Sequence, residues 1–167
     1  MFKKILVIAL LFLPLGIFAQ ESIKIAYVNT SEVMPFMPEF TAMQAELEKY
    51  ATQVEEELNL MQDEMTKKFA AFQQQQDTLT ESIKLRRMQD MNDLRDRAET
   101  YRQEADQEYA KKQQDLFVPI QQKLLDAIKS VGEANGYTYI MQEQGFLYIS
   151  PNAINATSLI KQKLGLQ

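Results

Sequence analysis

Carboxylates are the most numerous side chains of this sequence that could do chemistry, and some stand together, as in Glu55-Glu56-Glu57 and Asp63-Glu64. Two carboxylates can serve as general acid and general base when an apolar pocket separates their pKa values. Consecutive residues of a helix do not face each other, and the residues around these groups are mostly polar. A solvated helix face is therefore the favoured interpretation, with an acid–base pair as the alternative.

The residues that most often complete a catalytic site are absent. The sequence has no histidine and no cysteine, which removes the usual nucleophile–base systems and the common zinc ligands. Glycine is also absent from residues 39–118, so no glycine-rich phosphate loop can lie there. We therefore predict a protein that is not an enzyme and that binds no cofactor or metal.

The N-terminus predicts export. Lys3 and Lys4 precede an apolar run over residues 5–18, which ends at Ala19 before polar residues begin. This is the pattern of a secretory signal peptide at residues 1–19, cleaved after Ala19, with an uncleaved membrane anchor as the alternative. Because there is no cysteine, the mature chain has neither a disulfide nor an N-terminal lipid-bearing Cys. We expect a soluble exported protein.

Residues 39–118 predict a long helical arm. Glycine and proline, which cost a helix interior about 1 and 3 kcal/mol, are both absent from this stretch. A polar run at residues 73–78 interrupts the apolar spacing, so the arm is predicted to fold back as a hairpin with its tip within residues 74–82. Thr78 and Glu81 have the spacing of a capping box that would open the second helix.

The apolar residues of the arm predict the seam between its two helices. On the first flank they repeat every eleven residues, which favours a nearly straight seam, and on the second flank they follow heptad spacing. The predicted seam consists of Leu47, Tyr50, Val54, Leu58, Met61, Met65, Phe69 and Phe72 on one side and of Met91, Leu94, Ala98, Tyr101 and Ala105 on the other.

The remaining residues, 20–38 and 119–167, predict a small discontinuous body. A β-branched run at 23–28 predicts a strand. The runs at 137–141 and 146–149 predict a β-hairpin, whose loop is formed by residues 142–145. We expect the strands to supply the body core through Ile25, Val28, Ile140 and Leu147.

Helices complete this body. Pro119 is predicted to open an amphipathic helix that ends near Asn135-Gly136, and Asn155 or Thr157 can cap a last helix. A body of this size, split in sequence, is marginal as an independent core, and oligomerisation is the usual remedy.

Several of these segments resemble the Skp/OmpH family of periplasmic chaperones over the whole mature chain. The resemblance lies in Lys24-Ile25-Ala26-Tyr27-Val28-Asn29, in Pro119-Ile120 with Ala127-Ile128-Lys129-Ser130-Val131, in Gly136-Tyr137-Thr138-Tyr139-Ile140 and in Leu147-Tyr148-Ile149. It implies an α+β fold, in which a small β-rich trimerisation body carries long antiparallel helical-hairpin arms, so that a homotrimer looks like a jellyfish. It also implies a periplasmic, ATP-independent holdase that shields unfolded outer-membrane proteins. Composition alone leaves a structural or adaptor coiled-coil protein of the cell envelope as the alternative.

The charge of this chain departs from the basic members of that family. Without Lys3 and Lys4 the mature chain has 16 basic and 23 acidic residues, and residues 41–118 alone have 11 basic and 17 acidic residues. Lipopolysaccharide binding is therefore not expected to carry over. Acidity and export also disfavour a nucleic-acid partner.

Two sets of arm residues are candidates for contact with partners. Leu60, Leu85 and Met88 fall off the predicted seam, so we expect them to contact unfolded clients. Lys84, Arg86 and Arg87 lie near the tip, where they form either a solvated face paired with Glu81 or Asp90, or a basic patch for anionic lipid or an acidic client.

Overall fold

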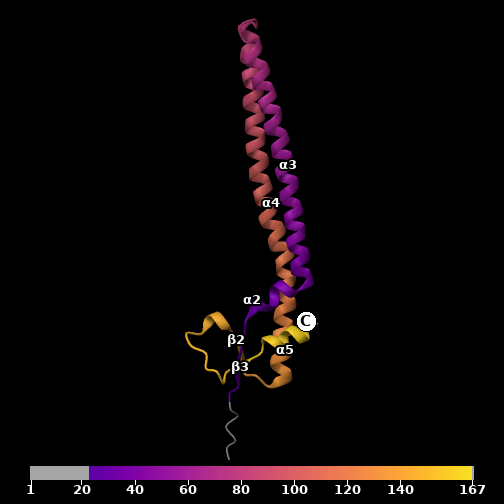
Figure 1. Ribbon diagram of the computed structural model, residues 1–167, viewed down its shortest axis with the longest axis vertical. Coiled ribbons are helices and arrows are strands. Elements are labelled where there is room, and N and C mark those ends of the chain that lie inside the picture. Colours follow the sequence, from indigo (N-terminus) through magenta and orange to yellow (C-terminus); the bar gives the residue numbers. More distant parts are fainter. Residues whose placement is uncertain (1–22, 167) are drawn as a thin grey trace, which may run out of the picture.

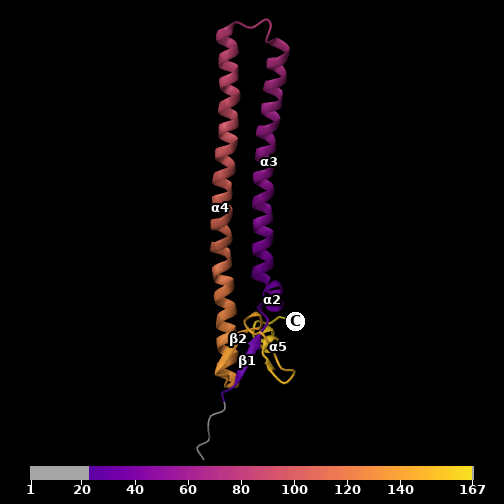
Figure 2. The ribbon, with the colours of Figure 1, turned by 90° about the vertical axis from the view of Figure 1, so that its left-hand side faces the viewer.

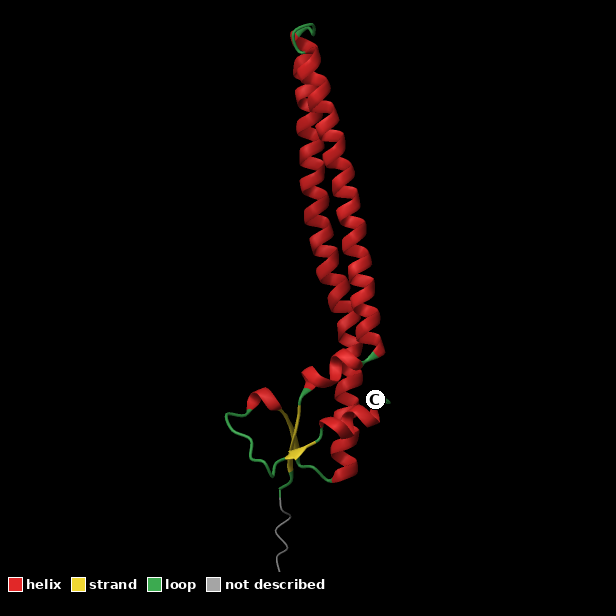
Figure 3. Cartoon of the chain, viewed as in Figure 1, coloured by secondary structure: helices red, strands yellow, loops and turns green. Residues whose placement is uncertain are grey.

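The computed structural model describes residues 23–166, so the predicted signal peptide at 1–19 lies outside the described residues. A long helical arm rises from a small body (Figure 1). The body contains the sheet and a lobe, residues 143–153, that projects to one side. Helices dominate, and the strands are short and confined to the body (Figure 3). The predicted fold of a helical hairpin on a small sheet is confirmed.

Two antiparallel helices form the arm, α3 (Pro38–Gln75) and α4 (Glu81–Asn135), and they run side by side over its whole length (Figure 2). At 1.5 Å per residue, α3 is about 57 Å long and α4 about 83 Å. The chain reverses between residues 76 and 80, a position within the predicted tip.

The turn is built differently from the predicted capping box. Thr80 is the N-cap of α4, and its carbonyl oxygen accepts from the backbone N–H groups of Ile83 and Lys84, both at 3.0 Å. The Thr78 hydroxyl instead donates to the carbonyl oxygen of Gln75 at 2.9 Å. The predicted box at Thr78 was wrong because this hydroxyl closes the end of α3.

Helix α4 continues through Pro119, which was predicted to start a new helix. A proline inside a helix removes one backbone hydrogen bond and crowds the preceding turn. Packing on both sides of Pro119 holds the helix together. Lys112 bonds Glu46 of α3 before it, and buried Ile120 joins the body core directly after it. Arm and body therefore share one continuous helix.

The sheet has three parallel strands in the order β2-β1-β3. Strand β1 (Ile25–Val28) lies in the centre, β2 (Tyr139–Gln142) pairs along its whole length, and β3 (Ile154–Asn155) pairs with Ala26 and Tyr27. The entire arm is thus the crossover between two neighbouring parallel strands.

The predicted β-hairpin of 137–141 with 146–149 was wrong, because residues 146–149 form no strand and the neighbours of β1 are β2 and β3. After β2 the chain enters a short 3₁₀ helix, η3 (Glu143–Gly145). The side-chain amides of Gln142 and Gln144 donate to the hydroxyls of Thr30 and Ser31, at 2.7 and 3.5 Å. These bonds hold residues 142–145 beside the helix that contains Thr30 and Ser31, so the chain does not return along β2.

Short helices connect the sheet to the arm: α2 (Thr30–Val33), the 3₁₀ helix η2 (Met34–Phe36) and α5 (Thr157–Lys163). Asn29 caps α2, where its side chain accepts from the N–H of Glu32 at 3.3 Å.

At the far end of α4, Gly136 takes the left-handed conformation, φ 63°, that a helix C-terminus favours. The Asn155 side chain accepts from the N–H of Thr157 at 2.8 Å, at the start of α5. The buried Thr157 hydroxyl accepts from the N–H of Asn29 at 3.0 Å, which ties α5 to the end of β1.

The core lies where the base of the arm meets the sheet and α5. One face of the body segment of α4 packs against β1, the α2–η2 segment and α5. The buried residues of this core are Ala26, Val28, Val33, Met37, Met43, Leu47, Ile120, Leu124, Ala127, Val131, Ala156 and Ile160.

Candidate binding surfaces of the arm

The predicted seam is the interface between α3 and α4. Its residues are buried or half-buried, with the single exception of Phe69, whose side chain is 52% exposed. Burial deepens toward the body, where Leu47 and Ala105 are buried, whereas near the tip Met65 and Phe72 are only partly covered.

The three apolar candidates for client contact are exposed, as their position off the seam requires: Leu60 by 63%, Leu85 by 68% and Met88 by 50%. They lie apart on the two helices, and none lines the hollows described below. Their contact with clients stays a prediction.

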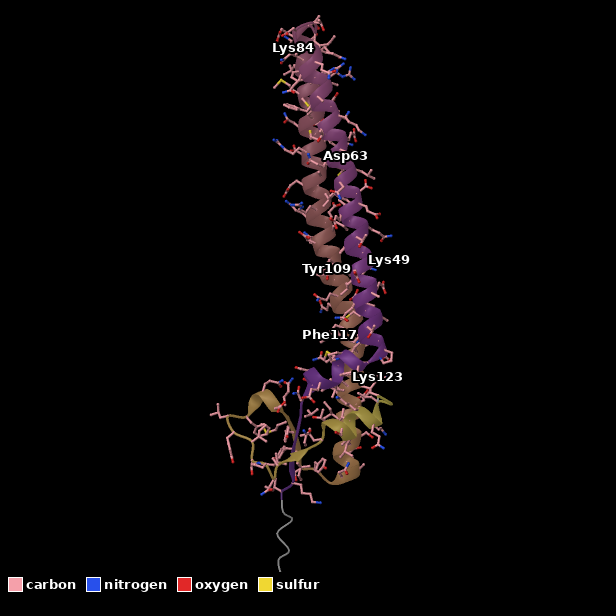
Figure 4. All side chains as sticks on the ribbon, viewed as in Figure 1. Lys49, Asp63, Lys84, Tyr109, Phe117 and Lys123 are labelled. Carbon is pink, nitrogen blue, oxygen red and sulfur yellow. The ribbon has the colours of Figure 1, made fainter. Side chains whose placement is uncertain are left out.

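The basic residues near the tip do not act as one group. Lys84, labelled near the tip in Figure 4, is bonded to Glu81 at 2.8 Å, as the solvated-face interpretation expects. Arg86 is exposed, and Arg87 is half-buried beside Asp90 and Lys68 in a small hollow. Neither arginine has an ion-pair partner within 4.0 Å among residues 23–166.

The four residues predicted for the body core separate into two kinds in the single chain. Val28 is buried and Ile140 is half-buried, close to Gly132 of α4. Ile25 is 47% exposed and Leu147 is fully exposed. These two residues do not contribute to the core of one chain, and their burial between chains stays a prediction.

A groove that the sequence did not predict runs along one face of the arm. Three hollows of about 630, 390 and 500 Å³ follow one another between α3 and α4. The first shares Ala51 and Tyr109 with the second, and the second shares Leu58 and Arg102 with the third. We call this continuous feature the proximal groove. Its apolar lining consists of Phe40, Met43, Leu47, Ala51, Val54, Leu58, Met61 and Met65 of α3 and of Leu94, Ala98, Ala105, Tyr109, Ala110 and Phe117 of α4.

Small residues create this groove. Ala51, Ala98, Ala105 and Ala110 line it at positions where larger side chains would fill the space between the helices. The available sequence signal was the alanine content of the seam and its borders. That signal becomes informative only when the register of α3 against α4 brings the alanines onto one face.

The proximal groove faces the side of the arm from which the sheet lobe projects. Tyr109 and Phe117 lie on the left-hand side of the arm in Figure 4, above the lobe, whereas Lys49 lies on the opposite side. This left-hand side faces the viewer in Figure 2. The groove therefore opens on the same side of the arm as the lobe.

Polar links join the two helices at the base of the arm. The Tyr50 hydroxyl donates to Glu108 at 3.1 Å, and Lys112 bonds Glu46 at 3.0 Å. Partial burial, together with the carboxylate of Glu108, raises the pKa of Tyr50 above its usual value. Closer to the body, the hydrogen bond from Lys123 lowers the pKa of Glu39.

Within residues 23–166 no group of three or more His, Cys, Asp or Glu side chains is placed to hold a metal ion. In the same range no helix has both the length and the apolar character needed to cross a membrane.

The protein is of the class in which a long helical hairpin projects from a small sheet-containing body. Residues 24–164 match the model of the OmpH-like outer membrane protein family. The chain belongs to this family.

Two known proteins illustrate the relationship. The chaperone protein Skp of Yersinia enterocolitica is 27% identical over 142 residues, which cover 85% of this chain and 87% of the relative. The crystal structure of an OmpH-like protein from Caulobacter crescentus superposes with a TM-score of 0.75 at 14% identity, covering 84% of this chain and 82% of the other. That second likeness shows a shared fold.

Proposed function

We propose that this protein is a chaperone of the periplasm that holds unfolded outer-membrane proteins without ATP and prevents their aggregation. Family membership and the similarity to a chaperone over most of both chains support the chaperone role. The single observation that carries the proposal is the arm itself, a long projecting hairpin with an apolar groove and exposed apolar side chains.

Retention would come from many weak contacts. Several arms around one client raise its effective concentration at each contact, so no single strong site is needed. Exposed side chains such as Leu60, Leu85 and Met88 would add apolar contacts that tolerate many client sequences.

We further propose that the working form is a homotrimer built through the body. Large apolar side chains remain exposed there, some of them at paired positions of the sheet such as Ile25 and Tyr139, and exposed apolar surface favours association. The exposed apolar residues of the body include Ile23, Ile25, Tyr139, Met141, Leu147, Tyr148 and Ile154. The sheet is also small and has open edges, which favours further pairing between chains.

An aggregation assay tests the chaperone proposal. A urea-denatured outer-membrane barrel protein is diluted into buffer with the mature chain, without nucleotide, and light scattering is followed. We expect suppression at a few trimers per client. Scattering equal to that of the client alone would overturn the proposal and favour a structural or adaptor protein of the envelope.

Sedimentation tests the trimer, with a pair of matched variants. Leu147→Asp should leave each chain folded, because Leu147 is exposed in the single chain, but should yield monomers. Val28→Asp should unfold the chain, because it buries an unpaired charge in the core. A wild-type protein that sediments as a monomer at micromolar concentration would rule out the trimer.

A further inference from the structure

We propose that the proximal groove holds one extended segment of the client, about eleven residues long, that alternates apolar with polar side chains and carries basic residues. This inference rests on the proposed function and names the kind of segment that each arm selects. The groove belongs to a single hairpin, so it is a separate feature from any space enclosed between arms.

The length of the groove fits an extended chain. Its lining runs on α3 from Phe40 to Met65, which corresponds to about 37 Å of helix. At about 3.3 Å per residue, this distance accommodates roughly eleven residues of extended polypeptide. A strand that crosses a bilayer has about the same length.

The cross-section of the groove fits alternation. Its floor is apolar and formed by buried or half-buried residues such as Met43, Leu47 and Leu94. Its mouth is rimmed by polar residues such as Gln44, Asn59 and Gln113. Because successive side chains of an extended segment point to opposite sides, every second residue could enter the floor while the others remain in water.

The charge of the rim selects basic segments. Carboxylates outnumber basic groups along the groove, whose charged lining residues are Glu48, Glu55, Glu99 and Asp106 against Arg95 and Arg102. None of these four carboxylates has an ion-pair partner within 4.0 Å among residues 23–166.

The flanks that contain the groove are acidic as a whole. Residues 39–65 and 94–118, which include its whole lining, have fourteen acidic and six basic residues, whereas residues 66–93 have four acidic and five basic residues. The acidity of the arm is therefore concentrated around the groove, where complementary charge favours basic partners.

Peptide binding to the full mature chain tests the proposal. The probe is a fluorescein-labelled eleven-residue peptide that alternates tyrosine or leucine with threonine and ends in two lysines, and its partner peptide ends in two glutamates. In fluorescence anisotropy we expect the lysine peptide to bind at least about fivefold more tightly at low salt, with the difference lost near 0.5 M salt. Equal affinities at low salt would overturn the charge selection.

Filling the groove should abolish this binding. Ala51 lines two of the three hollows and is itself exposed, so Ala51→Trp should occupy the groove without disturbing the core. We expect at least about tenfold weaker peptide binding for this variant. The matched control is Ala45→Trp on the opposite side of the hairpin, which should bind within about twofold of wild type. Equal effects of the two variants would contradict the proposal that the peptide binds in the proximal groove.

A second measurement does not depend on a bulky substitution. Because the chain has no cysteine, an environment-sensitive dye can be attached to Gln44→Cys, Gln62→Cys or Gln53→Cys. The first two positions line the groove and the third lies on the opposite side. Peptide should shift the emission of the first two dyes only. Shifts at all three positions, or at none, would reject the groove.

The aggregation assay distinguishes a failure of the proposed chaperone function from a failure of the groove proposal. If wild type does not suppress aggregation of the barrel protein, the proposed function is wrong. If wild type suppresses aggregation but the peptide binds Ala51→Trp as well as wild type, only the groove is wrong.

Discussion

The proximal and distal parts of the arm are held together in different ways. In the proximal arm, residues 39–60 and 96–118, polar bonds such as Tyr50 to Glu108 and Lys112 to Glu46 reinforce the apolar seam. In the distal arm, residues 61–95, no hydrogen bond or ion pair described for residues 23–166 joins α3 to α4. The seam there consists of half-buried residues such as Met61 and Met65, together with buried Leu94.

This difference indicates a division of labour along the arm. Directional bonds fix the register of the proximal helices and so preserve the shape of the two hollows of the groove nearest the body. Methionine side chains are flexible and tolerate rearrangement, so a seam made of them can open and close at small cost. We therefore expect the distal arm to have the low local stability that is typical of parts that move when a protein binds.

Removing the tip should have the largest effect on function. Replacing residues 68–88 by a four-residue glycine-rich turn removes the outer end of the distal arm but keeps every residue that lines the proximal groove. We expect suppression of barrel-protein aggregation to be lost, because shortened arms cannot surround a large client. Light scattering measures the loss.

Peptide binding by the same shortened protein tests whether the proximal groove works without the tip. The shortened protein should still bind the eleven-residue lysine peptide within about threefold of wild type, because the proximal groove remains. Circular dichroism should show a folded body. Full aggregation suppression by this protein would show that the distal arm is dispensable and that the division of labour is wrong.

Two equivalent leucine truncations test whether the arm and body differ in stability. Leu124 in the body and Leu94 in the distal arm are equally buried, each 3% exposed. Leu124→Ala should lower the free energy of unfolding by about 2–5 kcal/mol, as measured by urea denaturation. Leu94→Ala should leave the main transition nearly unchanged and instead speed hydrogen exchange of distal amides, because that part opens locally. Equal shifts of the main transition would mean that arm and body unfold as one unit.

The sequence predicted the features that depend on neighbours along the chain. The absence of glycine and proline from residues 39–118 indicated the two long helices, and the apolar spacing indicated their seam. The end of α4 at Gly136 also followed from a local signal. Such features depend on backbone preference and on one periodic face, both of which are visible in a single sequence.

Features that depend on distant partners were missed. The continuation of α4 through Pro119 depends on packing against α3 and the body, which outweighs the local cost of proline. The parallel pairing of β1 with β2 joins residues that are more than one hundred positions apart. The proximal groove exists only when alanines of two helices share one face, a property of register that neither helix specifies alone.

A smaller effect is expected from the Tyr50 hydroxyl. Tyr50→Phe removes the bonds to Glu108 and to the carbonyl oxygen of Ala105, at 3.1 and 3.4 Å. The loss should be about 1 kcal/mol or less in the stability of the proximal arm, measured by hydrogen exchange of its amides. Tyr148→Phe, at an exposed position of the body, keeps both proximal bonds, so as the control it should leave the hydrogen exchange of proximal-arm amides unchanged.

The pH dependence of this site has a defined sign. Because burial and Glu108 raise the pKa of Tyr50, the folded arm holds this proton more tightly than the unfolded chain does. The stabilisation is fully present below about pH 10, the usual tyrosine pKa, and is lost as pH rises through the raised value. Wild type should therefore lose more proximal protection than Tyr50→Phe between about pH 9 and 11. Identical losses would remove Tyr50 from the account of the proximal arm.

The smallest effect on client retention is expected at the basic tip. Changing Lys84, Arg86 and Arg87 together to Gln removes one exposed ion pair with Glu81, and such pairs contribute about 0–1 kcal/mol. Suppression of aggregation should therefore stay within about twofold of wild type.

Binding to vesicles that contain anionic lipid should weaken in the same variant, since each basic residue near such a surface contributes about 1 kcal/mol. Changing Lys49, Arg97 and Lys111 to Gln alters the charge equally but away from the tip, and it should affect vesicles less. If the tip variant instead loses the client while the control retains it, charge at the distal end is the principal determinant of binding, and the assignment of selection to the proximal arm is reversed.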